Sequence, residues 1–144
     1  MKMEFKVIKN GDIFNSKADS IVNPVNCEGV MGAGLALKFK ERYPKMFIHY
    51  KENCNLSIGR ISFYPTKDYL IVLFPTKNKW KNKSKYLYIM KGLIDLKKHL
   101  SVSPMKSIAF PKIGCGLGGL KWYVVKELII EILGDLDIVV ELYE

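Results

Sequence analysis

The 144-residue sequence has few of the side chains on which metal and nucleophilic chemistry usually depend. Its two histidines, His49 and His99, form no H-E-x-x-H motif, so we interpret both as surface or packing residues and find no support for a zinc peptidase. The three cysteines, Cys27, Cys54 and Cys115, are odd in number and show no C-x-x-C pair, which argues against a disulfide framework and a zinc site. No G-x-S-x-G elbow of a serine hydrolase is found either. We therefore expect reduced thiols, no metal and no cofactor.

Long apolar runs and a secretory leader are also missing. No stretch approaches the ~20 apolar residues of a membrane span, and the N-terminal residues lack an apolar signal core, so we expect a cytoplasmic protein without a membrane partner. Acidic residues are outnumbered, 14 against 23 lysines and arginines, for a net charge of +9. Such a charge attracts phosphate-bearing partners, although it can equally reflect a solubility surface. The length is typical of one domain, and we expect a monomeric domain over residues 1–144.

Strand-like and helix-like patterns alternate along the chain. Predicted strands cover residues 3–8, 18–25, 59–64, 69–74, 107–111 and 136–142, and predicted helices cover residues 35–43, 46–53, 85–100 and 122–133. The second strand is expected to end at Pro24, and Pro44 is expected to stop the first helix. Lys67 and Asp68 suit a hairpin turn, whereas the lysine-rich stretch 76–85 suits a solvated loop. The alternation predicts an α/β fold whose sheet is covered by helices on both faces.

Two of the predicted strands lead into glycine-rich loops, and each loop feeds a helix. The first loop is GVMGAG at 29–34, and the second is GCGLGG at 114–119. Glycine lets the backbone approach a ligand closely, and the free N–H groups at a helix start attract anions. Two such loops at the carboxyl edge of one sheet could hold a diphosphate from both sides.

Common nucleotide motifs do not fit these loops. A dinucleotide fingerprint starting at Gly32 needs a small residue where Leu37 stands. A P-loop starting at Gly29 needs Lys-Ser/Thr after Gly34, but Leu35 and Ala36 follow. What remains is a nucleotide diphosphate bound by backbone, with chemistry from the surrounding side chains.

Four segments together resemble a macrodomain: GDI at 11–13, IVNPVN at 21–26, GVMGAGLA at 29–36 and PKIGCGLGGL at 111–120. The resemblance runs from about residue 4 to 142. It implies a three-layer α/β/α fold with a mixed, largely parallel central sheet, and binding of ADP-ribose.

Three further segments resemble the macrodomain branch that contains the DNA ADP-ribosyl glycohydrolase antitoxin DarG and the terminal ADP-ribose protein glycohydrolase of animals. They are VMGAGLALKF at 30–39, RYP at 42–44 and FPTK at 74–77. The resemblance implies a catalytic role for Lys77, either through a covalent adduct with the distal ribose or as a fixed positive charge. By position alone, Lys77 could equally belong to the surface lysines of 77–85.

Further site residues follow from the same resemblance. Asp12 would accept a hydrogen bond from the adenine amino group beside the backbone of Ile13, and Asn26 would be catalytic at the distal ribose. Turn formation would explain both side chains as well. The remaining implied ligand contacts are Asn23, Val30, Met31, Gly32, Gly34, Leu35, Thr76, Pro111, Gly114, Cys115, Gly116, Leu117 and Gly118. Cys115 would be a lining residue and not a nucleophile, since no pKa-lowering partner is evident.

One position departs from the animal enzyme. That enzyme carries a catalytic aspartate where this chain has Gly118, whereas the DNA-directed type shows glycine there. The resemblance therefore favours ADP-ribosylated DNA as the substrate, with single-stranded DNA and an ADP-ribosyltransferase toxin as partners. Lys79 and Trp80 are candidate nucleic-acid contacts, although Trp80 could instead pack on the domain. The alternatives are ester-linked ADP-ribose on protein carboxylates, ADP-ribose-1″-phosphate, and a reader that binds ADP-ribose without turnover.

Overall fold

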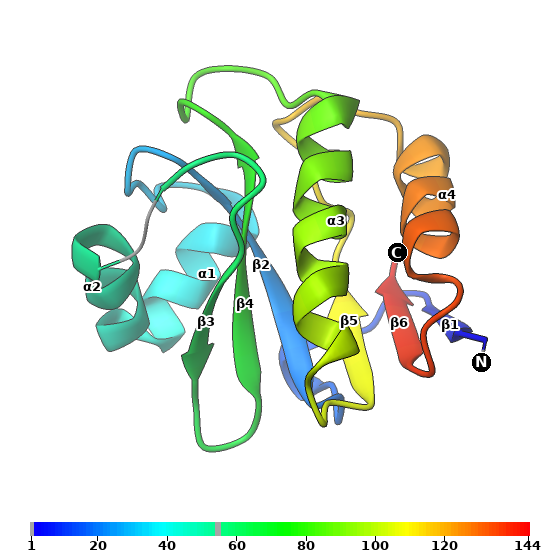
Figure 1. Ribbon diagram of the computed structural model, residues 1–144. Helices are drawn as coiled ribbons and strands as arrows, with labels where there is room; N and C mark the ends of the chain where they lie inside the picture. Colours follow the sequence, from blue (N-terminus) through cyan, green and yellow to red (C-terminus); the bar gives the residue numbers. More distant parts are fainter. Residues whose placement is uncertain (1, 54–55) are drawn as a thin grey trace.

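The computed structural model describes residues 2–53 and 56–144 and contains one mixed sheet (Figure 1). The elements in chain order are β1 (Glu4–Ile8), the 3₁₀ turn η1 (Ile13–Asn15), β2 (Ser20–Asn26), α1 (Gly34–Arg42), α2 (Pro44–Asn53), β3 (Ser62–Pro65), β4 (Leu70–Lys77), α3 (Tyr86–Ser101), β5 (Ser107–Phe110), α4 (Trp122–Leu133) and β6 (Val139–Tyr143). The strand order is β1-β6-β5-β2-β4-β3. Only the β3–β4 pairing is antiparallel, which confirms the expected largely parallel sheet.

Helices cover both faces of the sheet, as the alternation predicted. Helices α3 and α4 lie on one face, and α1 and α2 lie on the other (Figure 1). The pleat of β4 shows the division, because Val72 and Phe74 join the core under α3 and α4, while Ile71 and Leu73 join the core under α1 and α2. A strand buried on both faces must be apolar at every position, which explains its unbroken apolar run.

Helix α3 lies unusually close to β4 at one point. A Cβ atom added to Gly92 would stand 2.4 Å from the ring of Phe74, so only glycine allows the helix to rest directly on this ring. Phe74 is wholly buried. The contact fixes the strand three residues before Lys77.

The structure corrects several predicted boundaries, most importantly at the end of β4. The strand continues through Thr76 to Lys77 instead of ending at Phe74, because Pro75 and Lys77 pair with Val25 and Asn26 of β2. The expected loop at 76–85 therefore begins two residues later. Thr76 is buried and donates a hydrogen bond to the Val25 carbonyl.

Proline did not end β2 as predicted. Pro24 lies within the strand, which runs on to Asn26. The reason is that β2 pairs with β5 only at Ser20 and Ile21, so beyond these residues one side of β2 carries no neighbouring strand and needs no N–H donor. Pro44 does stop α1, and it also opens α2 at the position where a helix tolerates proline best.

Smaller corrections affect the outer strands. The strand predicted at 59–64 comprises only Ser62–Pro65, and the final strand begins at Val139 instead of residue 136, because the Leu136 N–H is used in a turn with the Leu133 carbonyl. The predicted hairpin turn at Lys67 and Asp68 is confirmed between β3 and β4.

Within the described ranges, no helix is both long and apolar enough to cross a bilayer. Across residues 2–53 and 56–144, no three histidine, cysteine, aspartate or glutamate side chains gather closely enough to hold a metal ion. Cys27 and Cys115 are free thiols, and Cys54 lies outside the described residues.

Candidate active site

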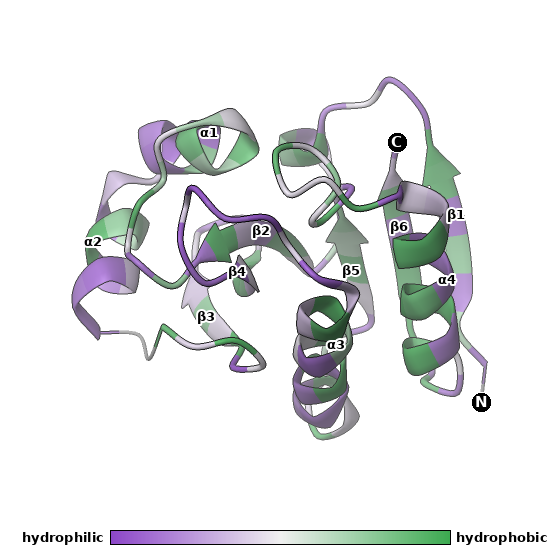
Figure 2. Ribbon diagram, turned by 90° about the horizontal axis from the view of Figure 1, so that it is seen from above, coloured by the Kyte–Doolittle hydropathy of each residue, from purple (hydrophilic) through white to green (hydrophobic). Residues whose placement is uncertain are grey.

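Both glycine-rich loops and the end of β4 meet above the carboxyl edge of the sheet, which Figure 2 views from above. They enclose a hollow of about 740 Å³, here called the lysine hollow. Fifteen predicted site residues line it: Asn26, Val30, Met31, Gly32, Gly34, Leu35, Thr76, Lys77, Trp80, Pro111, Gly114, Cys115, Gly116, Leu117 and Gly118. Residues far apart in the sequence thus face one shared space.

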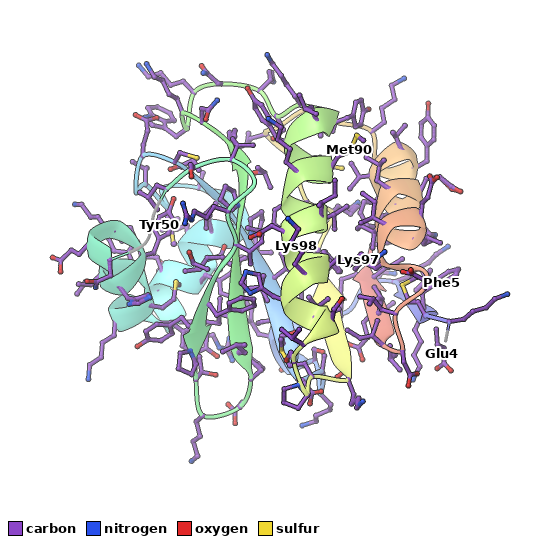
Figure 3. The ribbon with its side chains drawn as sticks, viewed as in Figure 1. Glu4, Phe5, Tyr50, Met90, Lys97 and Lys98 are labelled. Atoms are coloured by element: carbon purple, nitrogen blue, oxygen red, sulfur yellow. The ribbon has the colours of Figure 1, made fainter. Side chains whose placement is uncertain are left out.

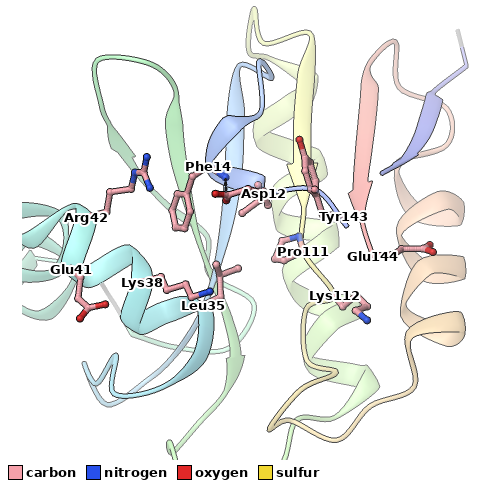
Figure 4. A pocket seen from close by; sticks show the side chains of 12 residues that line it. Asp12, Phe14, Leu35, Lys38, Glu41, Arg42, Pro111, Lys112, Tyr143 and Glu144 are labelled. Carbon is pink, nitrogen blue, oxygen red and sulfur yellow. Dashed lines mark hydrogen bonds between the residues drawn. The ribbon is translucent and has the colours of Figure 1, made fainter. Parts of the chain in front are cut away.

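A second hollow of about 730 Å³ lies next to the first and is here called the Asp12 hollow (Figure 4). It is lined by Asp12 and Ile13 at one end and shares Leu35, Pro111 and Lys112 with the lysine hollow. The shared residues join the two hollows into one elongated cleft, with Asp12 in one hollow and Lys77 in the other. An elongated cleft suits a ligand with two ends joined by a central group.

Asn26 builds the first glycine-rich loop. Its Nδ2 donates to the Val30 carbonyl at 2.7 Å, and its Oδ1 accepts from the N–H groups of Glu28 (3.0 Å) and Val30 (3.3 Å). The hydroxyl of Tyr50, which is labelled on α2 in Figure 3, donates to the backbone carbonyl of Asn26. Gly29 adopts the left-handed φ of +77° that this turn requires. The amide of Asn26 therefore shapes the loop as well as lining the hollow.

Each loop presents backbone to the lysine hollow. The first ends at Gly34, the first residue of α1, and no side chain caps this helix start, so N–H groups near the hollow remain free to meet an anion. The second loop is closed by a hydrogen bond from the Leu120 N–H to the Gly114 carbonyl. Gly116 is exposed at its centre, and a Cβ atom there would meet nothing within 4 Å. The open side of Gly116 is the cleft itself.

Lys77 stands beside Asn26, because the two residues are register partners at the ends of β4 and β2. Its Nζ donates to the Trp80 carbonyl at 3.3 Å. Burial lowers the pKa of Lys77, and the positive charge of Lys83 lowers it further. Lys83 is held over the second loop, where its Nζ lies 3.5 Å from the Leu117 carbonyl. A lowered pKa increases the fraction of neutral amine, which is the nucleophilic form of lysine.

The segment after Lys77 is fastened to the first loop. The Trp80 N–H donates to Glu28 Oε1 at 2.7 Å, and the Cys27 N–H donates to the Asn78 carbonyl at 3.0 Å. The Trp80 ring is half-exposed, and the Lys81 ammonium lies 5.3 Å from its centroid. Trp80 therefore lines the lysine hollow with about half of its surface exposed, whereas the exposed Lys79 does not line either hollow.

Asn23 stands apart from the other predicted ligand contacts. This residue is wholly buried and lines neither hollow, and its amide nitrogen faces the sulfur atoms of Met31 (3.8 Å) and Met46 (4.0 Å). Asn23 thus lies beneath Met31 of the first loop, and its contact with a ligand stays a prediction. Asp12 does line its hollow, and there its Oδ1 accepts a hydrogen bond from the Phe14 N–H at 3.0 Å (Figure 4).

Gly118 can carry no side chain in this loop. A Cβ atom there would lie 2.5 Å from both the Gly114 carbonyl oxygen and the Ser84 hydroxyl oxygen, and the first of these is backbone that cannot rotate away. In this loop geometry there is no room for an acidic side chain at position 118. Burial also raises the pKa of Cys115 to about 11, so its thiol is protonated at neutral pH and a poor nucleophile.

Sequence reasoning missed several lining residues. Phe14, Arg42 and Tyr143 line the Asp12 hollow, and Ser84 lines the lysine hollow. Tyr143 could have been found, because it ends β6 at the same carboxyl edge as Asn26 and Lys77. Ser84 gave no signal, since a serine in a lysine-rich stretch is typical of a solvated loop.

Comparison with known proteins places this cleft in a family. A family model described as Macro domain matches residues 22–129. The chain belongs to the macro domain family. Among curated relatives, the "DNA ADP-ribosyl glycohydrolase" of Mycobacterium tuberculosis is 39% identical over 141 residues, which cover 91% of this chain and 40% of that protein. This macro domain thus spans about two fifths of the length of that relative.

Solved structures agree with this assignment. The "Macrodomain of Thermus aquaticus DarG" superimposes with a TM-score of 0.91 at 35% identity, covering 99% of both chains. "Thermosipho africanus DarTG in complex with ADP-ribose" matches with a TM-score of 0.90 at 32% identity, covering 97% of this macro domain and 41% of that chain.

Proposed function

We propose that this macro domain binds ADP-ribose in its cleft and hydrolyses it from a modified base in DNA. The observation that carries the proposal is the meeting of Lys77 and Asn26, at the ends of paired strands, in a hollow lined by two glycine-rich loops. The names of the relatives, DNA ADP-ribosyl glycohydrolases among them, support the same reaction.

The shape of the cleft suggests how ADP-ribose lies in it. The adenine end occupies the Asp12 hollow, where the carboxylate of Asp12 accepts a hydrogen bond from the exocyclic amine and Ile13 contributes its backbone. The diphosphate lies between the two loops and receives their backbone N–H groups. The distal ribose then reaches Asn26 and Lys77 in the lysine hollow.

In this arrangement Lys77 acts as a nucleophile. Its neutral amine attacks C1″ of the distal ribose, the bond between C1″ and the base breaks, and the proton lost by the amine goes to the departing base. Water then adds to C1″, the bond to Nζ breaks, and the amine recovers a proton from that water. The lowered pKa of Lys77 increases the fraction of neutral amine, the form that this step requires.

Three features favour DNA as the carrier. The chain has a net charge of +9, which attracts a polyanion. The half-exposed Trp80 stands at the rim of the lysine hollow with Lys79 nearby in the sequence, as a stacking platform for a single strand would. The closed geometry at Gly118 leaves no room for the aspartate of the animal protein-directed enzyme. We accordingly propose a cytoplasmic role opposite an ADP-ribosyltransferase that modifies single-stranded DNA.

The proposal is tested by incubating the protein with a single-stranded oligonucleotide that carries ADP-ribose on one base. We expect release of free ADP-ribose and recovery of the unmodified oligonucleotide, resolved by electrophoresis and mass spectrometry. Parallel reactions contain ADP-ribosylated protein carboxylates and ADP-ribose-1″-phosphate. Turnover confined to those two substrates would exclude a DNA-directed enzyme, and tight ADP-ribose binding without any turnover would identify a reader.

The link between Lys83 and Lys77 predicts a shift in pH dependence. Because the neutral amine reacts, single-turnover rates at saturating enzyme should rise with pH through the lowered pKa of Lys77. In Lys83→Gln the neighbouring charge is gone, the pKa of Lys77 rises, and the ascending limb of the profile should move to higher pH. A limb that stays in place contradicts the electrostatic coupling, and a rate that falls as pH rises shows that Lys77 works as a fixed positive charge.

A further inference from the structure

Ser84 has a hydroxyl with an unusual environment. The residue is 6% exposed, and its Oγ has no hydrogen-bond partner in the described part of the chain. A buried hydroxyl without a partner costs stability, on the order of 1–3 kcal/mol. Such a group is retained where something else satisfies it, and Ser84 lines the lysine hollow. We therefore expect a ligand in the cleft to supply the hydrogen-bond partner of this hydroxyl.

The backbone of Ser84 is tied to the second glycine-rich loop. The Ser84 N–H donates to the Gly118 carbonyl at 3.0 Å. On either side, Lys83 Nζ reaches the Leu117 carbonyl, and the Tyr86 hydroxyl accepts from the Lys121 N–H at 3.1 Å. These three contacts join residues 83–86 to residues 117–121.

Because Gly118 has no side chain, the Ser84 hydroxyl has room beside its Cα atom. A Cβ atom on Gly118 would lie 2.5 Å from Ser84 Oγ, so a side chain at position 118 would displace the hydroxyl of Ser84 from its present position. The hydroxyl occupies the place where a side chain from the second loop would begin. On this side of the lysine hollow, the Ser84 hydroxyl is therefore a polar group that stands where a side chain of residue 118 would otherwise be.

We propose that the hydroxyl of Ser84 hydrogen-bonds to an oxygen of the distal ribose of ADP-ribose. Ser84 lines the hollow of Lys77 and Asn26 and is absent from the lining of the Asp12 hollow, so it lies away from the adenine end of the ligand. The loop N–H groups are donors only and suit phosphate oxygens, whereas a hydroxyl both donates and accepts and so suits a sugar hydroxyl. The assignment rests on the proposed function, because it takes ADP-ribose as the ligand.

The test compares Ser84→Ala with the wild type by titration calorimetry, using ADP-ribose and ADP, which lacks the distal ribose. We expect Ser84→Ala to bind ADP-ribose about 5- to 20-fold more weakly, the range for one lost hydrogen bond, and to bind ADP as the wild type does. The melting temperature without ligand should be unchanged or higher, because the substitution removes a buried hydroxyl that has no protein partner.

Ser101→Ala is the matched control, since this exposed serine lies at the other end of α3 and bonds only to the Lys97 carbonyl. It should bind both ligands as the wild type does. Equal weakening for ADP and ADP-ribose would move the contact to a phosphate and overturn the ribose assignment. Unchanged binding of both ligands, or a clear drop in melting temperature, would show that Ser84 serves the fold. A wild type that binds ADP but not ADP-ribose would overturn the proposed function itself.

Discussion

Lys77→Ala is expected to lose hydrolysis of ADP-ribosylated DNA by at least about 1,000-fold, the scale seen when a nucleophile is removed. The affinity for ADP-ribose should stay within about threefold of the wild type, because backbone N–H groups of the two loops make most of the hydrogen bonds to the diphosphate. Hydrolysis and binding are expected to respond differently because Lys77 and Asp12 lie in different parts of the cleft. Lys77 lines the lysine hollow beside Asn26, whereas Asp12 lines the neighbouring hollow, and Leu35, Pro111 and Lys112 line both. Single-turnover release of ADP-ribose and titration calorimetry measure the two quantities.

Two further variants make this result specific. Lys67→Ala removes an exposed lysine from the opposite end of the same strand, in the β3–β4 turn, and should hydrolyse the substrate at the wild-type rate. Lys77→Arg keeps the charge but removes the nucleophile, since an arginine does not deprotonate in proteins. It should be as inactive as Lys77→Ala. Substantial activity in Lys77→Arg would mean that charge suffices and would rule out the covalent step.

Gly32→Glu and Gly116→Glu are each expected to weaken ADP-ribose binding by at least about 100-fold. The two glycines stand in different loops, yet both line the lysine hollow, so a carboxylate on either loop would face the diphosphate and repel it. The fold has room for both side chains. A Cβ at Gly116 meets nothing within 4 Å, a Cβ at Gly32 meets only Val30 at 3.6 Å, and neither residue has a positive φ. Melting temperatures should therefore stay close to that of the wild type.

Val102→Glu is the control for added negative charge. Val102 is 87% exposed and follows α3 at the end of the helix away from the cleft, so this variant should bind ADP-ribose normally. If only one of the two glycine variants loses binding while both remain folded, the ligand is held by one loop. That result would contradict a diphosphate held from both sides.

Much of the fold follows from local patterns in the sequence. The four helices and six strands were predicted in order, because apolar periodicity and the glycine and proline positions mark each one. The end of β4 was not predicted correctly. The local pattern at Thr76 and Lys77 is typical of a loop, and these residues belong to the strand only because β4 pairs with β2. The strand end predicted at Pro24 was wrong for the same reason. Strand β2 tolerates a proline there because it no longer pairs with β5 beyond Ile21. Both errors concern long-range pairing, which local patterns do not contain.

The site was predictable where backbone conformation and chain position define it. Glycine-rich loops after strands and the FPTK segment pointed to the residues that line the lysine hollow. Asn23 lines neither hollow because the alternation of side chains along β2 sends it into the core beneath Met31, a placement that depends on the strand's pairing and not on its local pattern. Ser84 and the closed space at Gly118 depend on how two distant loops pack. Only coordinates reveal such packing.

The central claim is that both glycine-rich loops hold the same diphosphate, and amide NMR during an ADP-ribose titration tests it most directly. The N–H signals of residues 29–35 and 114–119 should shift together along one saturation curve, with a single dissociation constant and one ligand per chain. Shifts confined to one loop, two curves with different midpoints, or no shift in either loop would contradict it.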